Sequence, residues 1–519
     1  MRPMTSQLLV LRGRRDAIAQ NASESSHRGR QLPQNVSPFH PDPEQEITAE
    51  DSHASKRQRA RQCYDRTPSP RVYLDDRVID RFSALPTDLP REVVTEQLYN
   101  SRQCFVEMIT NVSSRDVYGP RFAHHILSMA VRNPVLLYSM MSAAMLFMRV
   151  AQKSERNYML ELQVNATAVR LLSEQMRNPQ TAATEANIWA VVALGYSGYV
   201  GEIRTGKCPR QSFLKELQSL HIYGRLVINK VHVAGLMQLV QMLGGVDKIT
   251  TPGMAQVICF ADLFESSRCL RRTFMPFVPH TRLYLEADRL AVSVAEREWA
   301  ESTMGSLATS FTMVWPDPGD DALLALLVVI RDMADFTVVV DNYVEGRFVP
   351  RPPVMLTDQR NYVQHRLMSL ESLEEIESRR TAPADLQYEA CRLACIAYSF
   401  LVIFPFPPVV GLFERLAKRL QISLLQMRTG VDASPYARVV MQLWILTLGA
   451  VVSIGLPERA WFVDELLPVM VRLGVDSWGQ MERLLRGFLW HPKTSERDGL
   501  DVYRDVKLKA HIVPAHAQQ

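Results

Sequence analysis

The chain has 519 residues, of which 47% are hydrophobic and 22% charged, ordinary values for a globular protein with room for about two to four domains. Its formal net charge of +4 is too small to indicate a dedicated nucleic-acid-binding domain. The seven cysteines are few, odd in number and scattered, which excludes a disulfide-rich secreted scaffold and favours a reducing compartment. No stretch reaches the roughly 18 apolar residues that span a bilayer, so we expect no membrane partner.

Residues 1–72 are rich in Ser, Pro, Gln, Arg, Asp and Glu and show almost no apolar periodicity. Because such a segment cannot bury enough apolar surface to offset the entropy of ordering, we expect it to be disordered. Its compact basic run at 56–61 favours a nuclear-import signal over a merely solvating stretch. The basic side chains are Lys56, Arg57, Arg59 and Arg61. Thr67 and Ser69 each precede a proline, and phosphorylation of either would add about −1.5 to −2 charges beside this run.

Residues 88–492 carry successive helical signals, and strand signals are nearly absent. We therefore predict an all-α fold with a large domain of a dozen or more helices. Asn133-Pro134, an N-cap residue followed by proline, opens a helix that is apolar nearly all round and is therefore expected to be buried. The expected helices span 91–112, 134–152, 158–176, 185–200, 219–243, 284–300, 321–344, 358–376, 384–404, 409–427, 437–455, 458–473 and 476–490, with one more opening at Thr251-Pro252. Residues 493–519 are expected to form a polar C-terminal tail.

The motifs of the common enzyme classes are absent from the sequence. It contains no glycine-rich nucleotide-binding loop, no Gly-x-Ser-x-Gly elbow, no His-Glu-x-x-His and no Cys-x-x-Cys. Asp75, Asp76 and Asp80 form a string like those with which all-α isoprenoid synthases hold Mg²⁺ on diphosphate. Interleaved arginines would neutralise this string, so a solvated helix start is favoured. A metal-dependent, isoprenoid-synthase-like enzyme is kept as the alternative.

Histidines and cysteines offer further metal or acid–base hypotheses. Cys391 and Cys395 share one face of a predicted helix, but packing as small apolar core residues is the favoured interpretation. The adjacent histidines at 124–125 point to different sides of a helix. His221 and His232 lie about three helical turns apart, too far to hold one ion. For all four histidines, structural or capping roles are favoured.

Three stretches carry characteristic residues in a characteristic order. In 221–277, a histidine and Gly-Leu precede a Gly-Gly pair that closes a helix, and an aspartate precedes a proline–aromatic turn. The residues are His232, Gly235, Leu236, Gly244, Gly245, Asp262, Pro276 and Phe277. The second and third stretches carry Glu389, Ala390 and Arg392, then Gly449, Ala450, Arg459, Trp461, Phe462, Trp478 and Trp490. Together, over roughly 90–492, they resemble the fungal-specific transcription factor domain, the regulatory region of zinc-cluster transcription factors.

The resemblance implies a nuclear transcriptional regulator that is not an enzyme and that acts through an all-α regulatory domain. Its implied partners are other transcription regulators or a second copy of the chain, with a small-molecule effector as a further option. Family members typically bind DNA through an N-terminal cluster of six cysteines. Only Cys63 precedes residue 100, so we expect no direct DNA contact, and zinc as a cofactor only if a further N-terminal cluster exists. A scaffold or titrating protein without a DNA role, and a cytoplasmic location, remain the alternatives.

Overall fold

The computed structural model describes residues 85–109, 118–153, 155, 157–199, 209–280, 292–347, 353–377, 386–407, 411–427 and 435–516. All of them belong to one unit, Ser69–Gln519. The predictions made for residues 1–72, including the basic run and both phosphorylation candidates, lie outside the described residues. The aspartate string at 75–80 lies outside them too.

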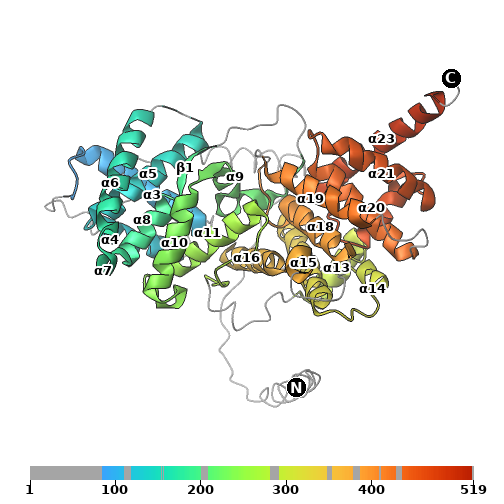
Figure 1. Cartoon of the computed structure of the whole chain (residues 1–519), viewed down its shortest axis with the longest axis horizontal. Coiled ribbons are helices and arrows are strands. Elements are labelled where there is room, and N and C mark those ends of the chain that lie inside the picture. Colours follow the sequence, from blue (N-terminus) through green and yellow to red (C-terminus); the bar gives the residue numbers. More distant parts are fainter. Residues whose placement is uncertain are drawn as a thin grey trace, which may run out of the picture. The chain divides into compact units, whose positions relative to one another are not determined.

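The fold is all-α, as predicted: the described residues form about 20 helices and almost no strand (Figure 1). The first elements are α3 (Arg91–Ile109), α4 (Tyr118–Ala130), α5 (Pro134–Gln152), α6 (Tyr158–Met176), α7 (Pro179–Ala182), α8 (Glu185–Ala193), β1 (Tyr196–Tyr199), the 3-10 helix η2 (Phe213–Ser219), α9 (Leu220–Tyr223), β2 (Leu226–Ile228), α10 (Lys230–Leu243), the 3-10 helix η3 (Val246–Lys248) and α11 (Met254–Cys269).

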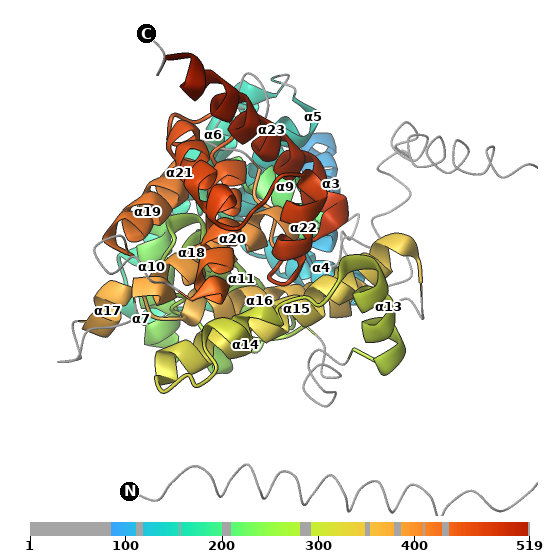
Figure 2. The same ribbon diagram turned by 90° about the vertical axis from the view of Figure 1, so that its right-hand side faces the viewer.

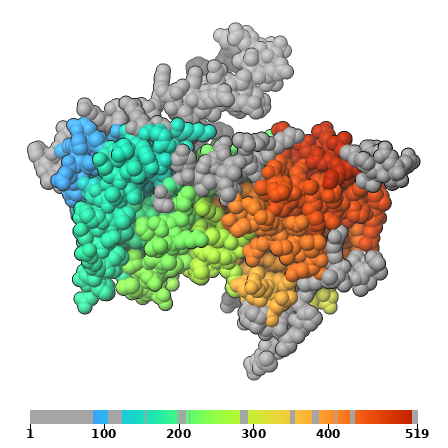
Figure 3. Space-filling view, turned by 45° about the horizontal axis from the view of Figure 1, so that its top comes forward, coloured from blue at the N-terminus to red at the C-terminus, as the bar shows by residue number. Residues whose placement is uncertain are grey.

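The remaining elements are helices, and many of those close in sequence pack on one another. They are α13 (Val294–Met304), α14 (Ser310–Val314), α15 (Asp321–Glu345), α16 (Pro353–Ser369), α17 (Leu373–Glu377), α18 (Leu386–Val402), α19 (Leu412–Met427), α20 (Tyr436–Val452), α21 (Glu458–Arg472), α22 (Trp478–Arg486) and α23 (Pro492–His516). On the face seen in Figure 3, the colours accordingly follow one another in sequence order with little mixing.

Helix α5 is a core helix of the first half. Asn133 caps it as predicted, because its side chain accepts a hydrogen bond from the amide of Leu136 at 3.1 Å. By length and composition α5 would be able to cross a membrane, which corrects the expectation that no stretch is apolar enough. Packing, chiefly on α3, α6 and α8, buries 67% of its most apolar window, as expected for a helix in a protein core.

Residues 219–243 do not form the single helix that was predicted. The chain kinks at Gln218 and Ser219, where φ is 54° and 52°, and β2 follows before α10 begins. β2 pairs antiparallel with β1, which replaces the end of the helix predicted over 185–200. The β-branched pair at 227–228 suits a strand. Local periodicity did not reveal this two-stranded sheet because its strands are distant in sequence.

A buried guanidinium holds the kink before α9. Arg360 on α16 donates hydrogen bonds to the carbonyl oxygen of Leu217 at 2.9 Å and to the side-chain oxygen of Gln218. It also lies 4.9 Å from the centre of the Phe404 ring. Burial lowers the pKa of Arg360 to about 9, so the group remains cationic at neutral pH. Arg360 therefore ties the kinked segment to α16 and to the chain that follows α18.

Two further boundaries differ from the prediction, and capping boxes explain both. The range 358–376 splits into α16 and α17 because Ser372 and Glu375 exchange the hydrogen bonds of a capping box. Within 284–300, the described helix α13 starts only after Ser293, which forms the same arrangement with Glu296.

The C-terminal segment 493–519 is not a polar tail over its described part. It forms α23, which lies across α20, α21 and α22 (Figure 2). Val502 and Val506, four residues apart, are fully buried on one stripe of this helix. Gly499 allows two tryptophan rings to approach closely, since an added Cβ would lie 2.6 and 2.8 Å from their atoms. The polar composition hid the helix because only this narrow stripe faces the core.

Gly449 on α20 provides a test of the packing between α20 and α21. An added Cβ there would overlap the Phe462 ring of α21. We expect Gly449→Ala to lower the free energy of unfolding by about 1–3 kcal/mol, because overpacking forces the buried ring to move. Chemical denaturation of the purified variant measures this difference.

The matched control is Gly479→Ala on α22, where no atom lies within 4 Å of an added Cβ. It should be neutral or stabilise the protein by up to about 1 kcal/mol, as alanine does in a helix. Equal effects of the two substitutions would contradict the observed contact between α20 and α21.

Candidate functional site

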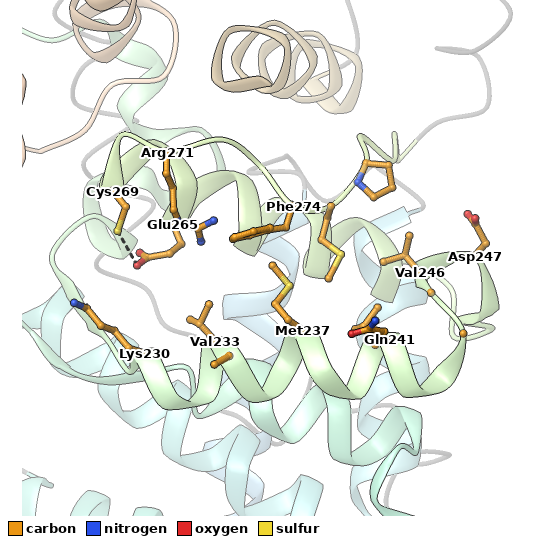
Figure 4. A pocket seen from close by; sticks show the side chains of 16 residues that line it. Lys230, Val233, Met237, Gln241, Val246, Asp247, Glu265, Cys269, Arg271 and Phe274 are labelled. Carbon is orange, nitrogen blue, oxygen red and sulfur yellow. Dashed lines mark hydrogen bonds between the residues drawn. The ribbon is translucent and has the colours of Figure 1, made fainter. Parts of the chain in front are cut away.

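An open pocket of about 1040 Å³ lies between α10, α11 and the segment that follows α11 (Figure 4). Four side chains of α10 lie along one wall: Lys230, Val233, Met237 and Gln241. The opposite wall carries Glu265, Cys269, Arg271 and Phe274. Apolar side chains dominate the lining, and the polar groups are few, as is typical of small-molecule sites.

The spacing of residues on α10 explains why this helix has a pocket face and a core face. Residues three or four apart share a helix face, so 230, 233, 237 and 241 line the pocket. Leu236 and Leu239 point to the other side and are buried. Asn229 fixes the start of the helix, because its side chain accepts a hydrogen bond from the amide of Val231 at 3.1 Å.

The glycine pair predicted to close this helix does so, and both glycines line the pocket. Gly244 and Gly245 have φ of 97° and 105°, a region that side chains disfavour. The amide of Gly245 donates to the carbonyl oxygen of Val240 at 2.9 Å, which satisfies a carbonyl at the helix end. Gly235 is different: nothing lies within 4 Å of an added Cβ, so packing does not require glycine there.

Asp262 of α11 holds the opposite wall in place. Its Oδ2 atom accepts hydrogen bonds from the amides of Phe274 and Met275 at 2.7 and 2.8 Å. Ser266 donates to Oδ1 at 3.2 Å, and an Arg271 nitrogen lies 3.8 Å from the same atom. This buried carboxylate therefore shapes the turn that walls the pocket.

His232 fixes the back of α10. Its Nδ1–H donates to the carbonyl oxygen of Leu194, at the end of α8, over 2.6 Å. His221, for which a structural role was also favoured, makes a similar bond to the carbonyl oxygen of Lys215 at 3.1 Å. Both histidines thus hold backbone segments together, in line with the favoured structural interpretation.

Glu265 is a buried carboxylate of the pocket lining, and only one of its two oxygens has a hydrogen-bond partner among the described residues. It is 7% exposed, and its Oε1 atom accepts a hydrogen bond from the Cys269 thiol at 3.1 Å. Its Oε2 atom is buried and has no hydrogen-bond partner among the described residues. Burial and the neighbouring Glu265 raise the pKa of Cys269, which keeps the thiol protonated as a donor.

A small recess of about 30 Å³ adjoins the pocket behind Glu265. Tyr196 and His232 line this recess together with Glu265. Burial and the Glu265 charge raise the pKa of Tyr196, so its hydroxyl is neutral at physiological pH. The volume is sufficient for a water molecule.

The other residues of the resemblance lie in the second half and hold helices together. Arg392 makes two hydrogen bonds to Glu389, at 2.7 and 2.9 Å, inside the core. Arg459 binds the carbonyl oxygen of Ala450 at 2.6 Å and the Asp505 carboxylate of α23 at 2.6 Å. The aromatic members pack in pairs: Trp461 on Phe462, and Trp478 on Trp490.

The metal hypotheses for the described cysteines and histidines receive no support from the geometry. Cys391 and Cys395 are fully buried in α18, as expected for apolar core residues. The two histidines at 124–125 are exposed. Within the described ranges, no three His, Cys, Asp or Glu side chains are grouped so that they could hold a metal ion.

The structure brings His232, Gly244, Gly245 and Asp262, four of the residues that carry the resemblance, to the frame of this pocket. The sequence patterns did not single out Glu265, Cys269 or Arg271, which are polar side chains of the pocket lining. The one signal in the sequence was a carboxylate three residues after Asp262, on an otherwise buried helix. No family model, curated protein or solved structure matches this chain. The roles of these residues therefore rest on their geometry.

Asp262→Ala tests whether this carboxylate shapes the pocket wall. Loss of the acceptor leaves two amides without their partner, so the free energy of unfolding should fall by about 1–3 kcal/mol. Hydrogen exchange at the amides of Phe274 and Met275 should become faster. Asp262→Asn, which keeps one acceptor oxygen, should show a smaller change. Unchanged protection of both amides in the alanine variant would refute this role.

The buried pair of Glu389 and Arg392 predicts a pH dependence of stability. Burial raises the pKa of Glu389, but hydrogen bonds and the charge of Arg392 outweigh it and hold the pKa below the ordinary value of 4.5. A depressed carboxyl pKa stabilises the fold above the unfolded-state value, and this contribution is lost as pH falls through the folded-state value. The native protein should therefore lose stability below pH 4.5.

Glu389→Gln isolates this contribution. At neutral pH it should cost about 3–5 kcal/mol, because Arg392 remains buried without its counter-charge. The difference from the native protein should shrink as pH falls below 4.5. Denaturation curves of both proteins over this pH range provide the measurement, and a difference independent of pH would contradict the assignment.

Proposed function

We propose that this chain is a nuclear transcriptional regulator whose all-α region responds to a small-molecule effector bound in the α10–α11 pocket. One observation supports the proposal above the others. His232, Gly244, Gly245 and Asp262, on which the resemblance to fungal regulators rests, are the residues that shape the pocket. None of the four needs to take part in chemistry to fulfil that role.

The pocket suits an effector in size and lining. At about 1040 Å³ it lies just above the range of about 300–1,000 Å³ typical of ligand sites. Met237 and Phe274 supply an adaptable thioether and an aromatic face, and the Phe274 side chain is 71% exposed. An apolar ligand would cover this ring.

Hydrogen bonds link the pocket to the core. His365 of α16 donates to the carbonyl oxygen of Met275, in the pocket wall, at 2.9 Å. One residue before it, the Gln364 side chain donates to Ser267 of α11 at 2.9 Å and accepts from Ser399 of α18. A ligand that moved the wall or α11 would therefore displace α16 and strain α18, and we propose this route for its effect on partner-binding surfaces.

The proposed partners are other transcription regulators or a second copy of this chain. Contact with DNA would be supplied by such a partner, since the resemblance covers only the regulatory region. An isoprenoid-synthase-like enzyme remains the alternative, and it would require Asp75, Asp76 and Asp80.

A tethering assay tests the proposal. The whole chain, fused to a heterologous DNA-binding domain, should change transcription of a reporter in a fungal cell. Met237→Trp places a larger ring in the pocket and should change this output by a factor of about five or more, the lower end of typical allosteric coupling. A fluorescent fusion without the added domain should enter the nucleus.

Gln238→Trp is the matched control, because residue 238 is exposed on the same helix and does not line the pocket. It should leave the reporter output unchanged. Nuclear exclusion together with a reporter that the tethered chain does not affect would overturn the proposal and favour a scaffold.

A further inference from the structure

The carboxylate of Glu265 lies at the boundary between the large pocket and the small recess behind it, and it lines both. Only one of its oxygens is satisfied, by the Cys269 thiol, and thiols are weak donors. The other oxygen, Oε2, is buried and has no partner among the described residues. A buried acceptor without a donor is costly, so a ligand that supplies the donor gains that interaction on binding.

The elements around this carboxylate carry three cationic side chains. Two of them contact other groups, and the third is exposed to solvent. Arg268 donates to the carbonyl oxygen of Leu226. The Arg271 guanidinium lies 3.8 Å from Asp262 and 4.4 Å from the centre of the Phe274 ring.

Lys230, the third cation, is exposed at the pocket rim. Among the described residues, no Lys, Arg or His nitrogen forms an ion pair with Glu265 within 4 Å. The carboxylate therefore lacks a counter-charge of its own.

We propose that the pocket binds an apolar molecule that carries a protonated amine, and that Glu265 recognises the amine. This proposal deepens the proposed function and rests on it for its regulatory meaning. The ammonium donates to the Glu265 carboxylate in a charge-assisted hydrogen bond, which is stronger than a neutral one. The apolar body lies between Val233 and Met237 of α10 and the exposed Phe274 ring.

The experiment uses the full-length protein and the uncharged dye Nile red as the pocket probe. Dodecylamine, dodecanol and dodecanoate, each below its micelle concentration, compete for the dye. They share one apolar chain and differ in head group, so differences in displacement report head-group recognition. Dodecylamine should displace the dye at roughly tenfold to hundredfold lower concentration than dodecanoate, the range expected for a hydrogen bond to a charged group.

Glu265→Gln keeps the shape of the side chain and removes its charge. It should abolish the preference for the amine while dye binding persists. Glu301→Gln, an exposed carboxylate on α13, is the matched control and should keep the preference. Met237→Trp should reduce dye binding itself, which shows that the dye occupies this pocket.

The outcomes separate this inference from the proposed function. Equal displacement by the three compounds would overturn it and assign Glu265 to holding a water in the recess. Preference for dodecanoate would overturn it in favour of Lys230 and Arg271. Neither result bears on the reporter test of the proposed function. Conversely, if the native protein prefers the amine but Met237→Trp leaves the reporter output unchanged, only the regulatory role is refuted. The head-group comparison uses the native protein, so it holds even if Glu265→Gln does not fold.

Discussion

The burial of α18 on every side is the constraint on which the rest of the structure depends. Every residue from 388 to 407 is buried. A helix without a solvent face needs neighbours all round, and α15, α16, α17, α19, α20 and α23 supply them. Its charged groups must also be neutralised internally, which the two hydrogen bonds between Glu389 and Arg392 achieve. Glu389 also accepts a hydrogen bond from the amide of Leu373 at 3.1 Å, so the same pair anchors the start of α17.

Polar side chains buried elsewhere follow the same principle, since most of them hold backbone in place. Asp262 binds two amides and His232 a carbonyl, while Arg360 stabilises a kink with two residues at positive φ. Such groups specify a unique arrangement, because each costs free energy unless its partner is in position. Glu265, by contrast, has one oxygen without a donor among the described residues, and it lines the pocket between α10 and α11.

Hydrogen bonds connect the walls of this pocket to helices of the core. His365 of α16 forms a hydrogen bond to the pocket wall. Gln364, also on α16, forms hydrogen bonds to α11 and to α18. These bonds are directional, and those of Gln364 are buried, so we expect a shift of the wall to be transmitted to α16. A regulatory pocket requires such a connection, whereas a site that only stores a ligand does not. The proposed regulatory role depends on this connection.

The sequence by itself determined the all-α class, the capped start of α5 and the glycine closure of α10. These follow from local periodicity, capping chemistry and spacing, which act within a few residues. Only the tertiary structure decided the pairing of β1 with β2, the packing of α23 through Val502 and Val506, and the position of Glu265 in a pocket lining. Each of these depends on contacts with residues far along the chain, and short-range sequence patterns carry no information about which distant residues pack together.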